Sequence, residues 1–178
     1  MAIYYLDASA LVKYYIREPG STWVRALVDA PLPDNGSRAH RVLMSEASIA
    51  ECAAAFAILY RTQRISRRAR DGAFRAFMRH IAGEIFHPIP VRTPDFQLAA
   101  YLTQHHPLKA YDAVQLAVAL RYAGILAVLG LPLTFVSGDA SCWPRPGPKA
   151  SPPRTPLTTS PPRMRRVRPD QARRASAV

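Results

Sequence analysis

Four carboxylates in this chain stand at positions where they could do chemistry. Asp7 follows the short apolar run of residues 3–6, and Asp139 follows a second such run. Glu51 and Asp112 lie in segments with helical character, among apolar neighbours that make an unpaired charge costly. Acids that gather in one place repel each other unless a cation lies between them, and Mg²⁺ or Mn²⁺ prefers oxygen ligands. Together the four predict a divalent-metal site that can activate water and neutralise charge on a phosphoryl group.

Each acid also has a simpler interpretation. Glu51 and Asp112 are acids near the start of a helix, where the helix dipole favours them, and Asp139 is a residue of a turn. A single acid would be explained in that way, but four such acids among the 11 of residues 1–142 favour the metal site. Glu46, five residues before Glu51, is a rival for the same role.

The elements that must position these acids alternate along residues 1–142. Short continuous apolar strands between helical patterns indicate an α/β domain whose parallel sheet is covered on both faces. Ligands of such sheets bind beyond the carboxyl ends of the strands, the position that Asp7 and Asp139 share. The expected strands are residues 3–6, 41–44, 86–91 and 133–136, and the expected helices begin at residues 8, 21, 45, 66, 93 and 108.

The charge of the chain is unevenly distributed. The net charge is +12, but residues 143–178 hold nine Lys or Arg and one Asp, or +8, which leaves 15 minus 11, or +4, for residues 1–142. The same tail holds nine of the 17 prolines, with Ser, Thr and Arg filling most of the rest. Such a segment cannot bury enough apolar surface to order itself, so we expect a domain over residues 1–142 and a disordered tail over residues 143–178.

A second concentration of positive charge lies in the helix expected after Ser66. Its apolar residues fall at helical spacing, and its other face carries Arg67, Arg68, Arg70, Arg75 and Arg79. A solvated helix face is the simpler interpretation of this run, and an RNA contact is the alternative.

The remaining composition indicates a cytoplasmic protein. Cys52 and Cys142 show neither a metal-binding spacing nor a disulfide framework, which fits a reducing compartment. We expect no signal peptide at the N-terminus, and no membrane span, because no run of about 18 apolar residues occurs.

Taken in order, these segments resemble the PIN domain, and specifically the small PIN ribonucleases that act as VapC-type toxins. The opening motif of the family is matched by residues 6–13, its Glu-Pro-Gly turn by residues 18–20, and its helical Asp-Ala motif by residues 111–117. Glu51 follows Ile-Ala as the second acid of the family does, and Asp139 ends the strand, Ser, Gly, Asp sequence of the last motif. The resemblance covers residues 1 to about 142 and implies a three-layer α/β/α fold with about four parallel strands.

The resemblance also implies a function. Members of this type are Mg²⁺- or Mn²⁺-dependent endoribonucleases, typically held by a small cognate antitoxin and commonly dimeric. Asp7 and Asp112 would be the main metal ligands, with Glu51 and Asp139 completing the acidic pocket. Ser9 and Ser137 match small hydroxyl positions that could orient a ligand or water, or could serve only as cap and turn residues.

The chain departs from the family pattern after Asp139. A helix and a final strand are expected there, but the Pro- and Arg-rich tail follows and contains no apolar strand. We therefore expect the C-terminal strand to be missing and one sheet edge to be exposed, as in a truncated or frameshifted copy. A catalytically impaired PIN-fold RNA-binding protein is the alternative function on this basis.

Two further interpretations remain open. A phosphatase of the haloacid dehalogenase type also has a nucleophilic Asp at the end of its first strand, but it needs a second Asp where this chain has Ser9. A non-catalytic module could bind RNA through the nine basic residues of the tail, by phosphate contacts with steep salt dependence.

Overall fold

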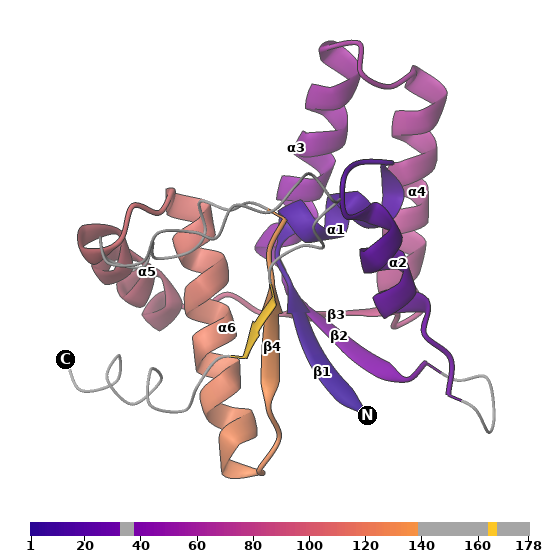
Figure 1. Ribbon diagram of the computed structural model, residues 1–178. Helices are drawn as coiled ribbons and strands as arrows, with labels where there is room; N and C mark the ends of the chain where they lie inside the picture. Colours follow the sequence, from indigo (N-terminus) through magenta and orange to yellow (C-terminus); the bar gives the residue numbers. More distant parts are fainter. Residues whose placement is uncertain (33–37, 139–163, 167–178) are drawn as a thin grey trace, which may run out of the picture.

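The computed structural model describes residues 1–32, 38–138 and 164–166. Five strands and six helices occupy these residues (Figure 1). The order is β1 (Ala2–Leu6), α1 (Ala8–Tyr15), α2 (Ser21–Asp29), β2 (His40–Ser45), α3 (Ala47–Arg61), α4 (Arg67–Ala82), β3 (Phe86–Ile89), α5 (Thr93–His105), α6 (Ala110–Val128), β4 (Leu133–Val136) and β5 (Met164–Arg166).

Four of the strands form a parallel sheet in the order β3-β2-β1-β4, which confirms the predicted fold class. The chain moves outward from β1 through β2 to β3, and then returns to place β4 on the other side of β1. The direction of winding therefore reverses between β1 and β4. In open α/β sheets the crevice beyond the carboxyl ends of the strands at such a reversal is where ligands bind.

The predicted absence of a strand after residue 136 needs correction. The strand β5 pairs antiparallel with β4 and extends the sheet to five strands, with Thr134 opposite Arg166 and Val136 opposite Met164. Backbone hydrogen bonds rather than an apolar pattern make this pairing, so hydrophobic periodicity could not predict it. The predicted disorder of the tail otherwise concerns residues 143–163 and 167–178, which lie outside the described residues.

Alternation along the strands divides the core into two halves. Ile3 and Tyr5 of β1 face one cluster, which α5 and α6 cover, whereas Leu6 faces the other, which helices α1 to α4 cover. Successive side chains of a strand point to opposite faces, so one strand supplies both halves. Figure 1 shows α5 and α6 on one side of the sheet and the other helices on the opposite side.

The helix α6 is the most apolar helix of the described chain. By length and composition alone it could cross a membrane, and it is the one described helix that could. Nine of its residues are nevertheless buried in the core against the sheet and α5. Arg121 of α6 also binds Asp95 of α5 through Nε at 2.7 Å, and Asp95 is 2% exposed. The packing of α6 in the core therefore accounts for the hydrophobicity of this helix.

Candidate active site

The carboxylate of Asp7 lies at the carboxyl end of β1, where the winding reverses. Its backbone is extended and the residue caps α1, because Oδ1 accepts a hydrogen bond from the backbone N–H of Ala10 at 2.8 Å. The Ser9 hydroxyl donates to the same oxygen at 2.6 Å. Asp7 is 4% exposed, so the strand end and the first turn of α1 hold this acid in one position.

A short hydrogen-bonded chain joins Asp7 to the end of β4. The Ser9 Oγ that donates to Asp7 accepts in turn from the backbone N–H of Gly138 at 2.8 Å. A Cβ on Gly138 would lie 2.9 Å from the backbone oxygen of Ser9 and 2.5 Å from Cε of Lys13. The close approach of the segment after β4 to α1 therefore requires glycine at this position. Ser9 therefore links Asp7, at the end of β1, to Gly138, just after β4, through its hydroxyl.

Burial raises the pKa of the Asp7 carboxyl above its ordinary value. Hydrogen bonds from the side chains of Ser137 and Ser9 and from the backbone of Ala10 oppose this change, and the nearby charge of Asp112 adds to it. The net rise means that the ionised form of Asp7 is held at a cost in the folded chain.

Glu51 and Asp112 approach Asp7 from two different helices. Burial raises the pKa of Glu51, and the charges of Asp7 and Asp112 raise it further. Asp112 is half-buried in the first turn of α6, whereas Glu51 lies beyond the first turn of α3, so the helix dipole explains the position of Asp112 and not that of Glu51. The three acids, far apart in the sequence, therefore repel one another in the folded chain.

A buried polar network joins the elements that carry these acids. Gln115 of α6 accepts a hydrogen bond from the Tyr5 hydroxyl at 2.7 Å and donates to Ser48 Oγ at 2.8 Å. Its Nε2 also donates a very short hydrogen bond to Oε2 of Glu51. Gln115 is 2% exposed, and Tyr5 and Ser48 are fully buried. The network sets the position of α6 against β1 and α3, and with it the separation of Asp7, Glu51 and Asp112.

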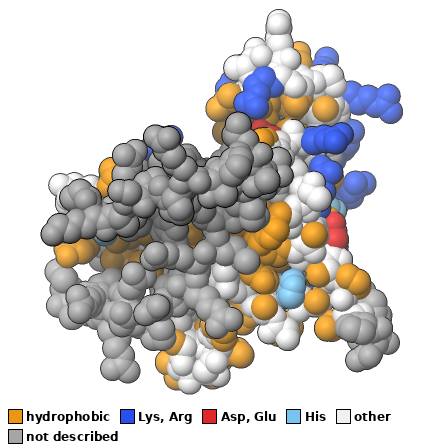
Figure 2. All heavy atoms as spheres, in the orientation of Figure 1, with side chains coloured by type: hydrophobic (Ala, Val, Ile, Leu, Met, Phe, Trp, Pro, Cys, Tyr) orange, Lys and Arg blue, Asp and Glu red, His pale blue; other side chains and the backbone are white. Residues whose placement is uncertain are grey.

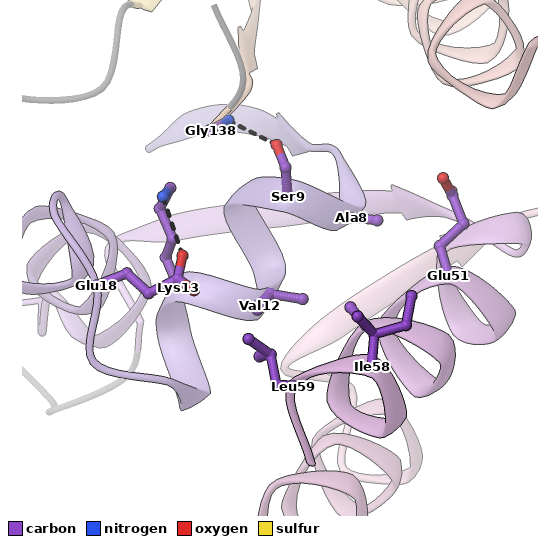
Figure 3. Close-up of a pocket in the computed structure, with 10 residues that line it drawn as sticks. Ala8, Ser9, Val12, Lys13, Glu18, Glu51, Ile58, Leu59 and Gly138 are labelled. Carbon is purple, nitrogen blue, oxygen red and sulfur yellow. Dashed lines mark hydrogen bonds and ion pairs between the residues drawn. The ribbon is translucent and has the colours of Figure 1, made fainter. Parts of the chain in front are cut away.

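A cleft of about 480 Å³ opens beside Glu51, the one of the three acids that lines it (Figure 3). In the lining of the cleft, Lys13 Nζ lies 3.3 Å from Oε2 of Glu18, and the Lys13 side chain is 13% exposed. Its lining comes from α1, the turn after it, α3 and the end of β4, namely Ala8, Ser9, Val12, Lys13, Glu18, Glu51, Ala55, Ile58, Leu59 and Gly138. The cleft therefore combines two carboxylates, one of them paired with the cation Lys13, and an apolar wall.

The predicted site residues can now be placed. The structure brings Asp7, Glu51 and Asp112 together at one end of the sheet, and the side chain of Ser137 is hydrogen-bonded to Asp7. Glu46, the rival for Glu51, is exposed at the N-terminal boundary of α3. Asp139 lies outside the described residues, although it directly follows Gly138.

Sequence reasoning missed the roles of four residues in this site. Gln115 and Ser48 each stand three positions from a candidate acid, on the same side of the helix, which is the signal that could have identified them. Lys13 and Gly138 gave no comparable signal. Their importance comes from the approach of the segment after β4 to α1, which local sequence does not reveal.

The donor atoms suit a hard divalent cation. Asp7, Glu51 and Asp112 offer carboxylate oxygens, and their mutual repulsion is what a bound cation would relieve. Over residues 1–32 and 38–138, no three His, Cys, Asp or Glu side chains stand as close together as the ligands of one ion. The oxygen donors therefore match a Mg²⁺-like ion in their chemical type and not in their spacing.

The fold and the acids at the carboxyl end of its sheet define an α/β domain with a candidate ligand site where the winding reverses. Residues 4–129 match the PIN domain family, and this chain belongs to that family. Proteins with this domain are generally nucleases that bind RNA and use divalent metals. The matched range includes Asp7, Glu51 and Asp112 and ends before β4. No curated protein matches the chain closely enough to be reported as a relative.

Replacing Asp7 by Asn is expected to stabilise the metal-free chain more at pH about 8 than at about 4. The raised pKa values of Asp7 and Glu51 mean that the folded state keeps protons that the unfolded state has lost above their ordinary values of 3.8 and 4.5. Their contribution to stability therefore falls as pH rises through that window, and Asn at position 7 removes one part of it. Urea unfolding of both proteins in EDTA measures the difference. A gain that is larger at the lower pH would contradict the sign.

Proposed function

We propose that this chain is a metal-dependent endoribonuclease that hydrolyses phosphodiester bonds of RNA with Mg²⁺ or Mn²⁺. The observation that supports this most is the mutual repulsion of Asp7, Glu51 and Asp112 at the carboxyl end of the sheet, beside an open cleft. Asp7 and Asp112 would be the main ligands, with Glu51 and Asp139 completing the set. A bound divalent ion would supply a polarised water and positive charge near the phosphate.

The residues of the cleft have separate tasks in this proposal. Ser9 and Ala10 hold Asp7 in place through their hydrogen bonds to Oδ1. Glu51 lines the cleft, where its carboxylate can accept a hydrogen bond from the attacking water. Lys13 puts a positive charge in the same cleft, where it can oppose the charge that develops on the phosphate.

We further propose that the protein is the toxin of a type II toxin–antitoxin pair, with a cognate antitoxin, a homodimeric assembly and a cytoplasmic location. The order of motifs from residues 6–13 to the acid at position 139 supports this assignment. The spacing of Cys52 and Cys142, which matches neither a metal site nor a disulfide framework, supports a reducing compartment. Co-expression with the product of a neighbouring small gene, followed by co-purification, would test the pairing.

The full chain is expected to cleave RNA in Mg²⁺ and to lose this activity in EDTA. The acids repel one another without a cation, so a bound ion should also raise the melting temperature, by mass action on the folded state. Gel analysis of a labelled RNA and a thermal melt with increasing Mg²⁺ measure the two effects. Cleavage that continues in EDTA would reject the metal-dependent mechanism. RNA binding without cleavage in either metal would support the catalytically impaired alternative.

A further inference from the structure

The hairpin formed by α3 and α4 carries a surplus of positive charge that the proposed active site does not use. Residues 61–79 contain seven arginines and one acid, Asp71, whereas residues 1–142 as a whole carry 15 basic and 11 acidic residues. Six of the seven arginines are exposed. Figure 2 shows Lys and Arg side chains gathered along this side of the molecule. A merely solvated face would mix both signs, as most protein surfaces do.

Three of these arginines form one stripe along α4. Arg68, Arg75 and Arg79 follow one another at spacings of seven and four residues, which puts them on the same side of the helix over about 16 Å. Elsewhere on the hairpin, ion pairs join Arg64 to Glu18 and join Arg67 and Arg70 to Asp71. In the described part of the chain, the three stripe residues make no ion pair. Arg75 and Arg79 are like charges four residues apart, an arrangement that destabilises a helix, whereas Asp71 lies on the same side between Arg68 and Arg75 and attracts Arg75.

Exposed apolar side chains lie beside the stripe. Phe74 is 40% exposed and Met78 is 39% exposed on α4. On the other side of α4 from the stripe, Tyr60 of α3 is 37% exposed, with the Arg70 guanidinium 4.7 Å from the centre of its ring. Arginine forks match phosphate geometry, and bases of single-stranded RNA stack on aromatic and guanidinium planes. The mixture of arginine and apolar surface suits a nucleic acid strand.

The same hairpin reaches the cleft. Ala55, Ile58 and Leu59 of α3 line the cleft wall. Arg64, in the turn between α3 and α4, lies 3.7 Å from Glu18, which lines the cleft from the other side. No residue of α4 lines the cleft itself, so a strand lying along α4 would enter it by passing the turn at Arg64.

We propose that the stripe of Arg68, Arg75 and Arg79, with Phe74 and Met78 beside it, binds the backbone of single-stranded RNA and leads it to the acidic cleft. The inference rests on the proposed function in taking RNA as the polymer. An acidic protein segment would match the charge of the stripe alone. RNA is the occupant that also accounts for the exposed aromatic side chains and for the continuity with the cleft.

The test is RNA binding by the full chain in EDTA, so that cleavage does not interfere. The probe is a 20-nucleotide unstructured RNA with a fluorescent label, followed by anisotropy. Arg75→Glu is expected to weaken binding about tenfold, whereas the matched charge change Arg41→Glu, on an exposed residue at the amino end of β2, should change it less than about threefold. Replacing Arg68, Arg75 and Arg79 together by Gln should reduce the slope of log affinity against log salt by about 2. The basic tail is present in every variant, so the differences belong to α4.

Equal losses for Arg75→Glu and Arg41→Glu would overturn the proposal, because they would report net charge rather than a surface. An unchanged salt slope in the triple variant would also overturn it. A third contrary result would be stripe variants that lose binding to an acidic peptide and still bind RNA as the natural chain does. Circular dichroism of each variant confirms folding, which the exposure of these arginines favours. Stripe-dependent RNA binding without cleavage in Mg²⁺ would reject the nuclease proposal and leave this surface standing. If the chain cleaves RNA while its stripe variants bind RNA normally, the nuclease proposal stands and the proposal for this surface fails.

Discussion

Replacing Asp7 or Asp112 by Asn is expected to lower Mg²⁺-supported RNA cleavage by about 10³-fold, since each removes several kcal/mol of metal-centred stabilisation of the transition state. The two acids come from the end of β1 and the first turn of α6, and each raises the pKa of Glu51 through its charge. Each substitution is therefore expected to lower cleavage when it is made alone. Single-turnover cleavage of a labelled RNA at saturating enzyme measures the rate.

Asparagine is chosen because it removes the negative charge of aspartate and keeps nearly the same side-chain shape. At position 7 it keeps the oxygen that accepts from Ala10 and Ser9, and Asn caps a helix as well as Asp does. The variant should therefore unfold no more easily than the natural chain, and in EDTA at neutral pH somewhat less easily, because a costly buried charge has gone. At position 112 the first-turn dipole interaction is lost, about 0.3–1 kcal/mol, and the repulsion of Asp7 and Glu51 by Asp112 is removed as well.

The neighbouring acids on either side of the start of α3 provide the matched control. Glu51→Gln should impair cleavage strongly, whereas Glu46→Gln should leave it unchanged, because Glu46 is exposed and Glu51 lines the cleft. The opposite result would exchange the roles of the two residues. Full cleavage by both the Asp7 and the Asp112 variants would reject the metal-nuclease proposal altogether.

Gln115→Leu is expected to lower the free energy of unfolding by about 2–4 kcal/mol, because the buried polar groups that it serves lose a partner. Tyr5, Ser48 and Glu51 all bond to its amide, and Tyr5 and Ser48 are fully buried. Loss of the donor also raises the pKa of Glu51 further and frees its carboxylate to move. Cleavage should therefore fall as well, at temperatures where the variant remains folded.

The control for Gln115 is a glutamine on the surface. Gln104 of α5 is exposed, so Gln104→Leu should change stability by less than about 0.5 kcal/mol. Tyr5→Phe removes one arm of the network, and its effect should not add to that of Gln115→Leu, since both variants break the same hydrogen bond. Equal urea midpoints for the Gln115 and Gln104 variants would show that the network does not stabilise the fold.

Most of the architecture could be predicted because it is written in local patterns. Short apolar runs alternating with helical periodicity predicted the parallel sheet, and the strand before Asp7 and the strand before Ser137 lie as expected. Ser66 caps α4 through its side chain, as its position before the arginine-rich helix predicted. The short strand β5 was not predicted, because its pairing with β4 depends on backbone hydrogen bonds between distant segments.

The acids of the candidate site were identified from their positions relative to strands and helices. Their proximity to one another in the folded chain could not be identified in that way. Asp7 lies at a strand end because a strand precedes it, and that is a local property. That Glu51 and Asp112 repel it is a property of how α3 and α6 pack on β1. Gln115 sets this packing through contacts 64 to 110 residues away in the chain.

The sequence by itself therefore determined the fold class, the order of the elements and which residues could carry charge to the carboxyl end of the sheet. Periodicity and turn chemistry act over a few residues, so they can be recognised without the fold. Only the tertiary structure decided that Ser9 joins Asp7 to Gly138, that Lys13 shares a cleft with Glu51, and that Arg64, in the turn before α4, pairs with Glu18 of that cleft. These relations depend on the separation of segments that meet only when the sheet and its two helical layers have packed.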